Sequence, residues 1–303
     1  MGRQYSLSVI EIPDWEPPSP QIEFFRRSRT FSDFPVLLAF RRPRRLLPIG
    51  SSPFPELRVA VDTEQLFASE ETPSLDVRRE MVLEIQDRLC EVYHCPIDYF
   101  HQLDPVSELV SSMLNHRTKN ADASKARRAL LARFGSWEAV RDASPEDLEP
   151  AIRSVRWPEL KSRTIPAALR DVTERAGSLN LDFLAAMEPD DARAWLEKIK
   201  GVGPKTSAAV LSFSTMRSRA LPVDSHHHRV AQRIGLIGPK VGPGPSHAIL
   251  ESLLPDDWDA QKVYDHHEVL MLHGQRVCVH AKPRCGDCPL TDLCRHYQQN
   301  VAD

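Results

Sequence analysis

The chain has 303 residues, of which 41% are hydrophobic and 27% charged, a balance typical of a globular protein with one or two domains. This composition excludes a coiled coil, a collagen-like fibre and a fully disordered chain. The longest apolar run near the start, Pro35–Phe40, is too short for a membrane span or a signal-peptide core, so we expect an intracellular protein with no membrane partner. The net charge of −3 gives no sign of the basic surface that nucleic-acid-binding domains usually carry.

Residues 1–76 form a leader whose composition differs from that of the rest. Its first 75 residues hold 10 of the 25 prolines and 7 of the 11 phenylalanines, and a basic run lies at Arg41–Arg45. Because this proline density interrupts helices and strands, we predict an irregular, disordered leader, or sequence upstream of a true start such as Met81. A phosphate-contacting or partner-binding arm at Arg41–Arg45 is one alternative. A targeting peptide is the other, disfavoured by interspersed acidic residues.

From about Val77 onward, the hydrophobic spacing predicts helices joined by short turns. The first covers residues 78–93, and the second covers residues 107–117 with Ser107 as its N-cap. Further helices are expected at 120–134, 145–154, 159–177, 189–199, 204–215, 225–235, 245–254 and 259–275. The sequence shows neither a run of alternating strands nor a tandem repeat. The predicted fold class is therefore all-α.

A tight turn separates two of these helices at residues 199–206. Gly201 ends the first helix, Gly203 completes the turn, and Pro204 lies near the start of the second, an order of residues that suits a helix-turn-helix sterically. The backbone N–H groups at the new helix N-terminus can bind a phosphate. Lys205 lies near the positive end of the helix dipole, which favours a neutral, nucleophilic amine. The alternative is a solvent-exposed lysine in an ordinary turn.

Asp224 follows Lys205 by 19 residues and directly precedes the helix predicted at 225–235. It is expected to cap that helix, and its carboxylate is also a candidate to accept a proton from Lys205 or to stabilise a developing positive charge. Three consecutive histidines follow, at positions 226–228. Because successive helical residues point about 100° apart, these three cannot all bind one ion, and we predict no metal site there.

Four of the six cysteines crowd the C-terminal end, with the spacing C-x6-C-x2-C-x5-C: Cys278, Cys285, Cys288 and Cys294. In an intracellular chain, such a group favours a metal or cluster site over disulfides. Four thiolates can hold either a zinc ion or a 4Fe–4S cluster, and the chemistry alone favours zinc somewhat. Cys90 and Cys95 fall outside the pattern, and we expect them to be ordinary buried thiols.

The segments GVGPKT at 201–206 and VDSH at 223–226 resemble the helix-hairpin-helix and Gly/Pro-Asp signature of DNA glycosylases, and are most similar to the endonuclease III family. The cysteine spacing, together with HG at 273–274 and KPRC at 282–285, resembles that family's cluster loop. The resemblance therefore implies a 4Fe–4S cluster on the four cysteines. In this family the cluster shapes a loop that meets the DNA backbone, which implies phosphate contacts for Lys282 and Arg284.

The similarity runs from about Val77 to His296 and implies two helical lobes with the active site in the cleft between them. Residues 107–217 would form a six-helix lobe that ends with the hairpin. Residues 77–106 and 218–303 would form the iron–sulfur lobe. Lys205 and Asp224 would lie on opposite walls of the cleft.

The resemblance also implies a base-excision repair enzyme, a bifunctional DNA N-glycosylase and AP lyase. The damaged nucleotide would flip out of the duplex, Lys205 would attack the anomeric carbon and expel the base, and the resulting Schiff base would allow β-elimination on the 3′ side. Double-stranded DNA with oxidised pyrimidines or abasic sites is the expected substrate. We expect a monomer that associates with the nucleoid.

Several positions depart from the endonuclease III pattern. Arg117 stands where relatives carry a glutamine that fills the gap left by the flipped base, and Asn120 replaces an acidic residue. Trp157 takes the place of a leucine wedge, and an aromatic wedge can unstack a base step. A surface arginine and a buried core tryptophan are the alternatives for Arg117 and Trp157. The predicted DNA contacts are Lys200, Gly201, Gly203, Arg117, Trp157, Lys282 and Arg284.

Two other functions are open to the same sequence. An adenine or mismatch glycosylase is disfavoured by the presence of Lys205 and by the end of the chain nine residues after Cys294, which leaves no extra recognition domain. A non-catalytic iron–sulfur protein that binds DNA or senses redox state would use the hairpin and cluster alone. In that protein, Lys205 would have no role.

Overall fold

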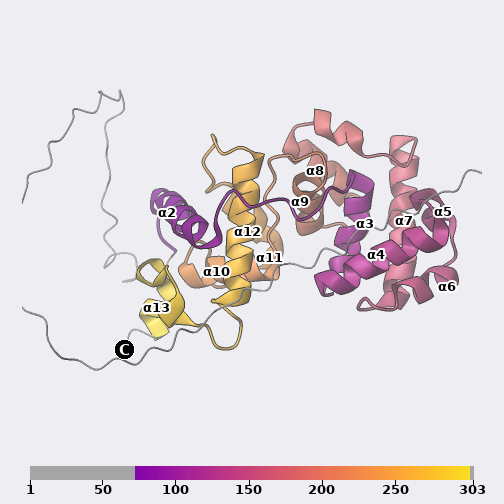
Figure 1. Cartoon of the computed structure of the whole chain (residues 1–303). Helices are drawn as coiled ribbons and strands as arrows, with labels where there is room; N and C mark the ends of the chain where they lie inside the picture. The colour runs from indigo at the N-terminus through magenta and orange to yellow at the C-terminus, as the bar shows by residue number, and fades with distance from the viewer. Residues whose placement is uncertain (1–71, 301–303) are drawn as a thin grey trace, which may run out of the picture. The chain divides into compact units, whose positions relative to one another are not determined.

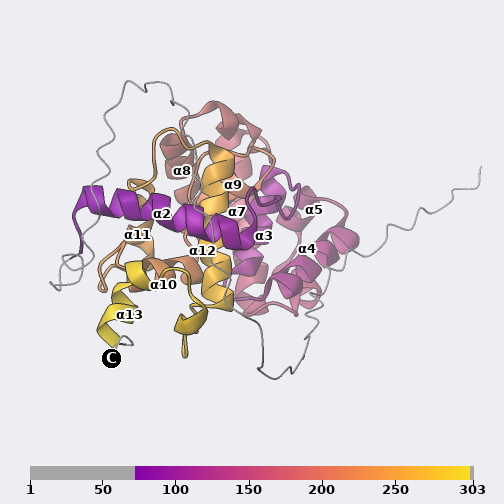
Figure 2. The ribbon, with the colours of Figure 1, turned by 60° about the vertical axis from the view of Figure 1, so that its left-hand side comes forward.

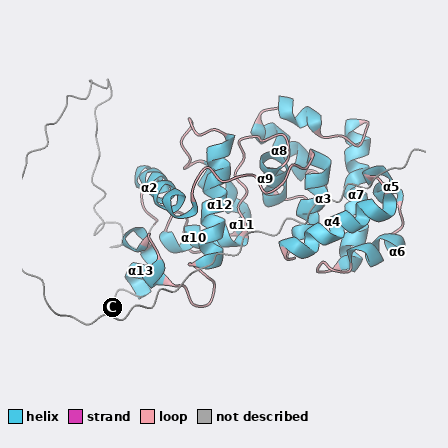
Figure 3. Ribbon diagram, viewed as in Figure 1, coloured by secondary structure: helices cyan, strands magenta, loops and turns pink. Residues whose placement is uncertain are grey.

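The regular secondary structure of the described residues is helical. The structure is a computed structural model that describes residues 72–300, and within that range it contains helices and no strands (Figures 1 and 3), which confirms the predicted all-α class. The α-helices are α2 (Leu75–Tyr93), α3 (Pro105–Asn115), α4 (Asn120–Phe134), α5 (Trp137–Asp142), α6 (Pro145–Leu148), α7 (Pro158–Ala176), α8 (Pro189–Glu197), α9 (Pro204–Phe213), α10 (Ser225–Ile234), α11 (Pro243–Glu251), α12 (Ala260–Arg276) and α13 (Arg295–Asn300). The 3-10 turns are η1 (Glu149–Ile152), η2 (Asp182–Ala186), η3 (Cys285–Asp287) and η4 (Thr291–Leu293).

The predicted leader lies outside the described residues, except for positions 72–76, and α2 begins within it at Leu75. The basic run at Arg41–Arg45 is likewise outside them. None of the helices in the described part of the chain has the length and apolar character needed to cross a membrane.

Local chemistry explains where the helices differ from the sequence prediction. Asp104, not Ser107, caps α3, because its carboxylate accepts hydrogen bonds from the Ser107 amide at 2.9 Å and the Ser107 hydroxyl at 2.5 Å, and Pro105 suits the first helical position. The helix predicted at 145–154 divides into α6 and η1. Pro150 lies in η1 and has no amide to donate to an α-helical bond.

Two hydrophobic cores organise the described helices, which all belong to one compact unit. The first core combines side chains from α3 to α9, among them Leu109 and Leu169. The second combines α2 with α10, α11, α12 and the C-terminal turns, and includes Ile85 and Leu270. A smaller buried group of Ala209, Phe213 and Tyr264 joins α9 to α12. The lobe boundaries expected at residues 106/107 and 217/218 stay a prediction.

Helix α12 lies at the centre of the second core. It packs against α2, α9 and α10, and in Figure 2 α2 crosses it. At Gly274 helix α12 lies close against α10: a Cβ added there would lie 2.9 Å from the Cβ of His226 and 3.1 Å from its carbonyl oxygen. The small residue is therefore needed for the contact between the two helices.

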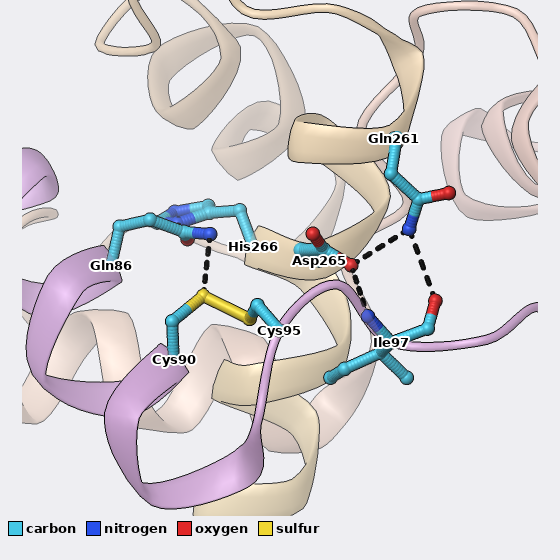
Figure 4. The surroundings of a disulfide bond; sticks show 7 residues. All are labelled: Gln86, Cys90, Cys95, Ile97, Gln261, Asp265 and His266. Carbon is cyan, nitrogen blue, oxygen red and sulfur yellow. Dashed lines mark hydrogen bonds between the residues drawn. A yellow bond between two sulfur atoms is a disulfide. The ribbon is translucent and has the colours of Figure 1, made fainter.

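Cys90 and Cys95 were predicted to be buried thiols, and this prediction is wrong: they form a disulfide, and both residues are half-buried (Figure 4). The physical reason is local, because α2 ends at His94 in a left-handed conformation that turns the chain back and brings the two Cα atoms to 4.9 Å. The Gln86 side chain donates to the Cys90 sulfur at 3.1 Å and contacts the His266 ring of α12 at 2.9 Å. The start of the linker to α3 is thus fastened to α12.

We expect Gly274→Ala to lower the free energy of unfolding by about 1–3 kcal/mol, because the added methyl group has no space between α10 and α12. Urea denaturation followed by circular dichroism measures the change. Gly286→Ala is the matched control, since a Cβ at Gly286 meets no atom within 4 Å. Equal stability of the two variants would contradict this account of the contact.

Candidate active site

A pocket of about 440 Å³ lies where elements of both cores meet, and its volume is in the range of small-molecule and cofactor sites. One wall comes from α3, α7 and the hairpin before α9, and the other from Val223 and the first turns of α11. The lining residues include Met113, His116, Trp157, Leu160, Lys161, Gly201, Gly203, Lys205 and Val223.

The hairpin brings both predicted glycines to this pocket. Gly201 has a φ of +92°, a conformation that favours glycine. Gly203 is the N-cap of α9 in extended backbone, and a Cβ there would meet nothing within 4 Å, so the protein leaves open space beside it. No side-chain cap covers the first turn of α9, which suits an approaching phosphate. Lys200 is exposed next to the turn but does not line the pocket.

Lys205 is half-buried and lines the pocket from the first turn of α9. Burial lowers the pKa of its amine, while the nearby carboxylates of Glu108, Asp224 and Glu268 oppose that change. The amine also lies 5.9 Å from the centre of the Phe213 ring. Because desolvation has the largest effect, the net change is a lower pKa, which raises the share of neutral amine above that of a free lysine.

Asp224 caps α10, as expected from its place before that helix. Its Oδ1 atom accepts hydrogen bonds from the amides of His226 at 2.9 Å and His227 at 2.7 Å. Both bonds end on the same oxygen, so Oδ2 lies outside the cap. The carboxylate also raises the pKa of Lys205, which shows that capping and an electrostatic effect on the lysine coexist in one side chain.

Two buried glutamates complete this charged group, and the sequence analysis missed both. Glu108 on α3 is 2% exposed, accepts a hydrogen bond from the Ser112 hydroxyl at 2.8 Å and lies 2.9 Å from the His101 ring. Burial raises the pKa of Glu268 on α12 to about 7, with smaller contributions from Asp224 and Asp265. The available signal was a single acidic residue within an apolar helical stretch, as in the run HHEVLML at 266–272.

The two predicted base-contacting residues lie in left-handed backbone. Arg117 has a φ of 52° and Trp157 a φ of 58°, a conformation that costs non-glycine residues about 1–2 kcal/mol each. Trp157 lines the pocket and is 37% exposed, which rules out a buried core tryptophan. Arg117 is exposed outside the pocket lining, and His116 takes the lining position, with its ring 5.9 Å from that of Trp157. Asn120 is exposed at the first position of α4.

Two neighbours of Trp157 on α7 also line the pocket and were missed. Leu160 is 55% exposed and adds an apolar side chain beside the tryptophan. Lys161 is 4% exposed, and burial lowers its pKa to about 8. A lysine at this depth is unusual.

The four C-terminal cysteines are half-buried and line a single second pocket. Burial raises the pKa of the Cys288 thiol to about 11 and that of Cys294 to about 12. Arg233 donates to the Cys278 sulfur at 3.3 Å, and the Leu290 amide donates to the Cys288 sulfur at 3.4 Å. This donor set fits a thiolate-bound group, since a bound metal deprotonates its thiol ligands.

The choice between zinc and a 4Fe–4S cluster stays a prediction. Among the described residues, no three or more His, Cys, Asp or Glu side chains converge on a single metal position. In the same loop, Lys282 is exposed. Arg284 is exposed too, but its guanidinium donates to the Arg276 carbonyl and lies 3.9 Å from the Asp287 carboxylate, so it is held within the loop.

The comparisons with known proteins show similarity to DNA repair proteins. The sequence profile of the HhH-GPD superfamily of base excision DNA repair proteins matches residues 110–256. Endonuclease III of Thermotoga maritima is 29% identical over 199 residues, which cover 65% of this chain and 86% of the relative. Protein ROS1C of Oryza sativa is 29% identical over 181 residues, or 55% of this chain, but the match spans only 10% of that relative.

The fold is shared with a solved structure of a trapped endonuclease III–DNA covalent intermediate. The TM-score is 0.62 at 22% sequence identity, and the match covers 73% of this chain and 97% of that chain.

We expect Glu268→Gln to stabilise the protein at pH 8 by up to about 3 kcal/mol, because the native state must ionise a carboxyl group whose pKa is raised to about 7. Between pH 4.5 and 7 the native state binds more protons at Glu268 than the unfolded state does. Wild type therefore loses stability as the pH rises through this range. Urea denaturation at pH 4.5 and pH 8 measures the difference, which should vanish at the lower pH. A pH-independent difference would show that Glu268 ionises normally.

Proposed function

Because the chain belongs to the HhH-GPD superfamily of base excision DNA repair proteins, we propose that it is a DNA glycosylase with AP lyase activity. The observation that carries the proposal is the position of Lys205, which lines the pocket and has its pKa lowered by burial. A neutral amine is the form that attacks an electrophilic sugar carbon. The trapped covalent complex of endonuclease III with DNA supports covalent chemistry on this fold.

In the proposed reaction, a nucleotide leaves the base stack and enters the pocket. The lone pair of the Lys205 amine attacks the anomeric carbon as the bond to the base breaks, and the base departs with the bonding electrons and takes up a proton. The ionised carboxylate of Asp224 stabilises the positive charge that develops on the sugar, and it then accepts the proton that the bound amine loses. Opening of the sugar ring gives a Schiff base, loss of the adjacent proton follows, and the bond to the 3′ phosphate oxygen breaks.

The proposed substrate is double-stranded DNA that carries oxidised pyrimidines or abasic sites, bound by a monomer inside the cell. The open space at Gly203 and the uncapped start of α9 supply a seat for a phosphate. Trp157, half-exposed at the pocket, supplies an apolar surface that can enter a base step. Lys200 and Lys282 are exposed cations for the DNA backbone.

Cys278, Cys285, Cys288 and Cys294 would hold a 4Fe–4S cluster, whose part when bound is to order the loop that carries Lys282. The hydrogen bonds from Arg233 and the Leu290 amide to the sulfurs would stabilise the thiolate form of these ligands.

We expect wild type to form a covalent adduct with an abasic-site duplex under borohydride, and Lys205→Ala to lower the rate of adduct formation at least about a hundredfold. Gel electrophoresis of the trapped complex measures the rate. Lys198→Ala is the matched control, because Lys198 is exposed outside the pocket. Undiminished trapping by Lys205→Ala would refute the lyase proposal, and a wild type that binds DNA without trapping would favour the non-catalytic alternative.

Asp224 has two roles that substitution can separate. We expect Asp224→Asn to keep the stability of the fold, since asparagine also caps a helix well, but to lower the trapping rate about tenfold or more because the carboxylate charge is lost. Asp224→Ala should lose about 1 kcal/mol of stability in addition. If Asp224→Asn traps at the wild-type rate, Asp224 serves only as a helix cap.

Purified protein should be brown and contain iron and acid-labile sulfide in equal amounts, since four cysteines line one pocket. Elemental analysis and the visible absorption spectrum measure both. Cys288→Ser should lose the colour, while Cys90→Ser should keep it because Cys90 lies in the disulfide far along the chain from the cluster loop. Colourless wild-type protein with one zinc per chain would overturn the cluster prediction.

A further inference from the structure

Two loops beside the pocket carry the residues expected to meet the DNA bases. The first loop, residues 116–119, joins α3 to α4 and contains Arg117. The second loop, residues 153–157, joins η1 to α7 and contains Trp157. Each loop holds one non-glycine residue at positive φ. Such conformations persist only where surrounding contacts impose them. The contacts that hold these two loops therefore determine where Arg117 and Trp157 lie relative to the DNA bases.

Hydrogen bonds join the two loops to each other. The Arg156 amide in the second loop donates to the Thr118 hydroxyl oxygen in the first at 3.1 Å. The Ser154 hydroxyl also joins the second loop to α4, because it donates to the Asp122 carbonyl at 3.1 Å. The Thr118 hydroxyl in turn donates to the His116 carbonyl at 3.3 Å. Thr118 is therefore a point at which both loops are tied.

Lys161 contacts the first loop through its side chain and the second through its backbone amide. Its ammonium group donates to the carbonyl oxygens of Leu114 at 2.6 Å and His116 at 3.0 Å, and to the Thr118 hydroxyl oxygen at 3.0 Å. The His116 carbonyl belongs to the peptide unit that leads into Arg117. The backbone amide of Lys161 donates to the Trp157 carbonyl at 3.0 Å. All three donors of the ammonium group have acceptors, and none of these acceptors is a carboxylate.

We propose that Lys161 is a positioning residue that holds the two loops in a fixed arrangement relative to each other. Through that arrangement it determines how the enzyme discriminates the base opposite the lesion. This inference rests on the proposed function of the pocket. A lysine that formed an ordinary ion pair would place a carboxylate beside it, whereas the Lys161 ammonium group bonds the residues on each side of Arg117. It reaches the second loop through the Thr118 hydroxyl, which also accepts from the Arg156 amide next to Trp157. The arrangement fits alignment of those two side chains, since discrimination between bases needs donors and acceptors held in fixed geometry.

The first experiment measures, in the protein without DNA, how strongly the Lys161 hydrogen bonds protect the two loops from opening. Lys161→Met keeps an unbranched side chain of similar length and removes the donors. Hydrogen exchange should become about tenfold faster at the amides of residues 116–119 and 156–157, and remain unchanged in the second core. Lys161→Arg keeps donors and charge and should restore part of the protection. Lys125→Met, an exposed lysine on α4, is the matched control. Unchanged exchange at both loops in Lys161→Met would overturn the inference.

The second experiment measures discrimination by binding alone, with duplexes that carry a tetrahydrofuran abasic analogue opposite each of the four bases. Wild type should prefer some opposite bases, and Lys161→Met should reduce the ratio of the strongest to the weakest Kd by about fivefold or more. This ratio does not depend on the fraction of folded protein, so a merely structural role would leave it unchanged. Equal weakening on all four duplexes, or no preference in wild type, would overturn the inference.

The two experiments separate this inference from the proposed function. If wild type binds no abasic duplex at any opposite base, the proposed function fails, and the exchange measurement still decides whether Lys161 ties the loops. If wild type binds and traps normally while Lys161→Met changes neither exchange nor the Kd ratio, the proposed function stands and the positioning role fails. Thr118→Val should resemble Lys161→Met, and the double variant should add little to either change, because both act through one set of hydrogen bonds.

Discussion

The burial of a charged group where α9 and α10 meet α12 is the constraint on which the site depends. Lys205 lies in the first turn of α9, and Asp224 caps α10. Glu108 on α3 and Glu268 on α12 lie near the lysine. Buried charges are costly unless opposite charges lie near. The four groups therefore depend on one another: the carboxylates limit the cost of burying the lysine, and burial itself keeps the pKa of the lysine low.

The helices around this group are packed with rings that carry no charge at neutral pH. His227 stacks on His267 at 5.8 Å and meets His266 edge-on at 5.7 Å. Burial lowers the pKa of His266 to about 3 and that of His267 to about 4, so both remain neutral near pH 7. The three histidines that followed Asp224 in the sequence thus point in different directions, and His227 serves as part of the packing.

Much of the fold follows from local sequence, and the exceptions have local causes. The limits predicted for α4, α9 and α12 lie within two residues of the observed ones, because each helix is an uninterrupted stretch that buries apolar side chains in a core. The start of α3 was misplaced since two polar residues compete for the cap and Asp104 has the stronger acceptor. The Cys90–Cys95 disulfide was missed because the prediction assumed reduced thiols, while the turn at His94 brings the two together.

For the site, the sequence by itself determined which groups we propose for the chemistry: the GVGPKT turn, Lys205, Asp224 and the four-cysteine spacing are all visible as local patterns. Only the tertiary structure decided their surroundings. Glu268 lies 63 residues after Lys205 in the chain, and Lys161 lies 43 residues after Thr118, so no local periodicity relates them. Their pKa values and hydrogen bonds arise from burial between helices that are distant in sequence, and desolvation is a property of packing rather than of any single residue.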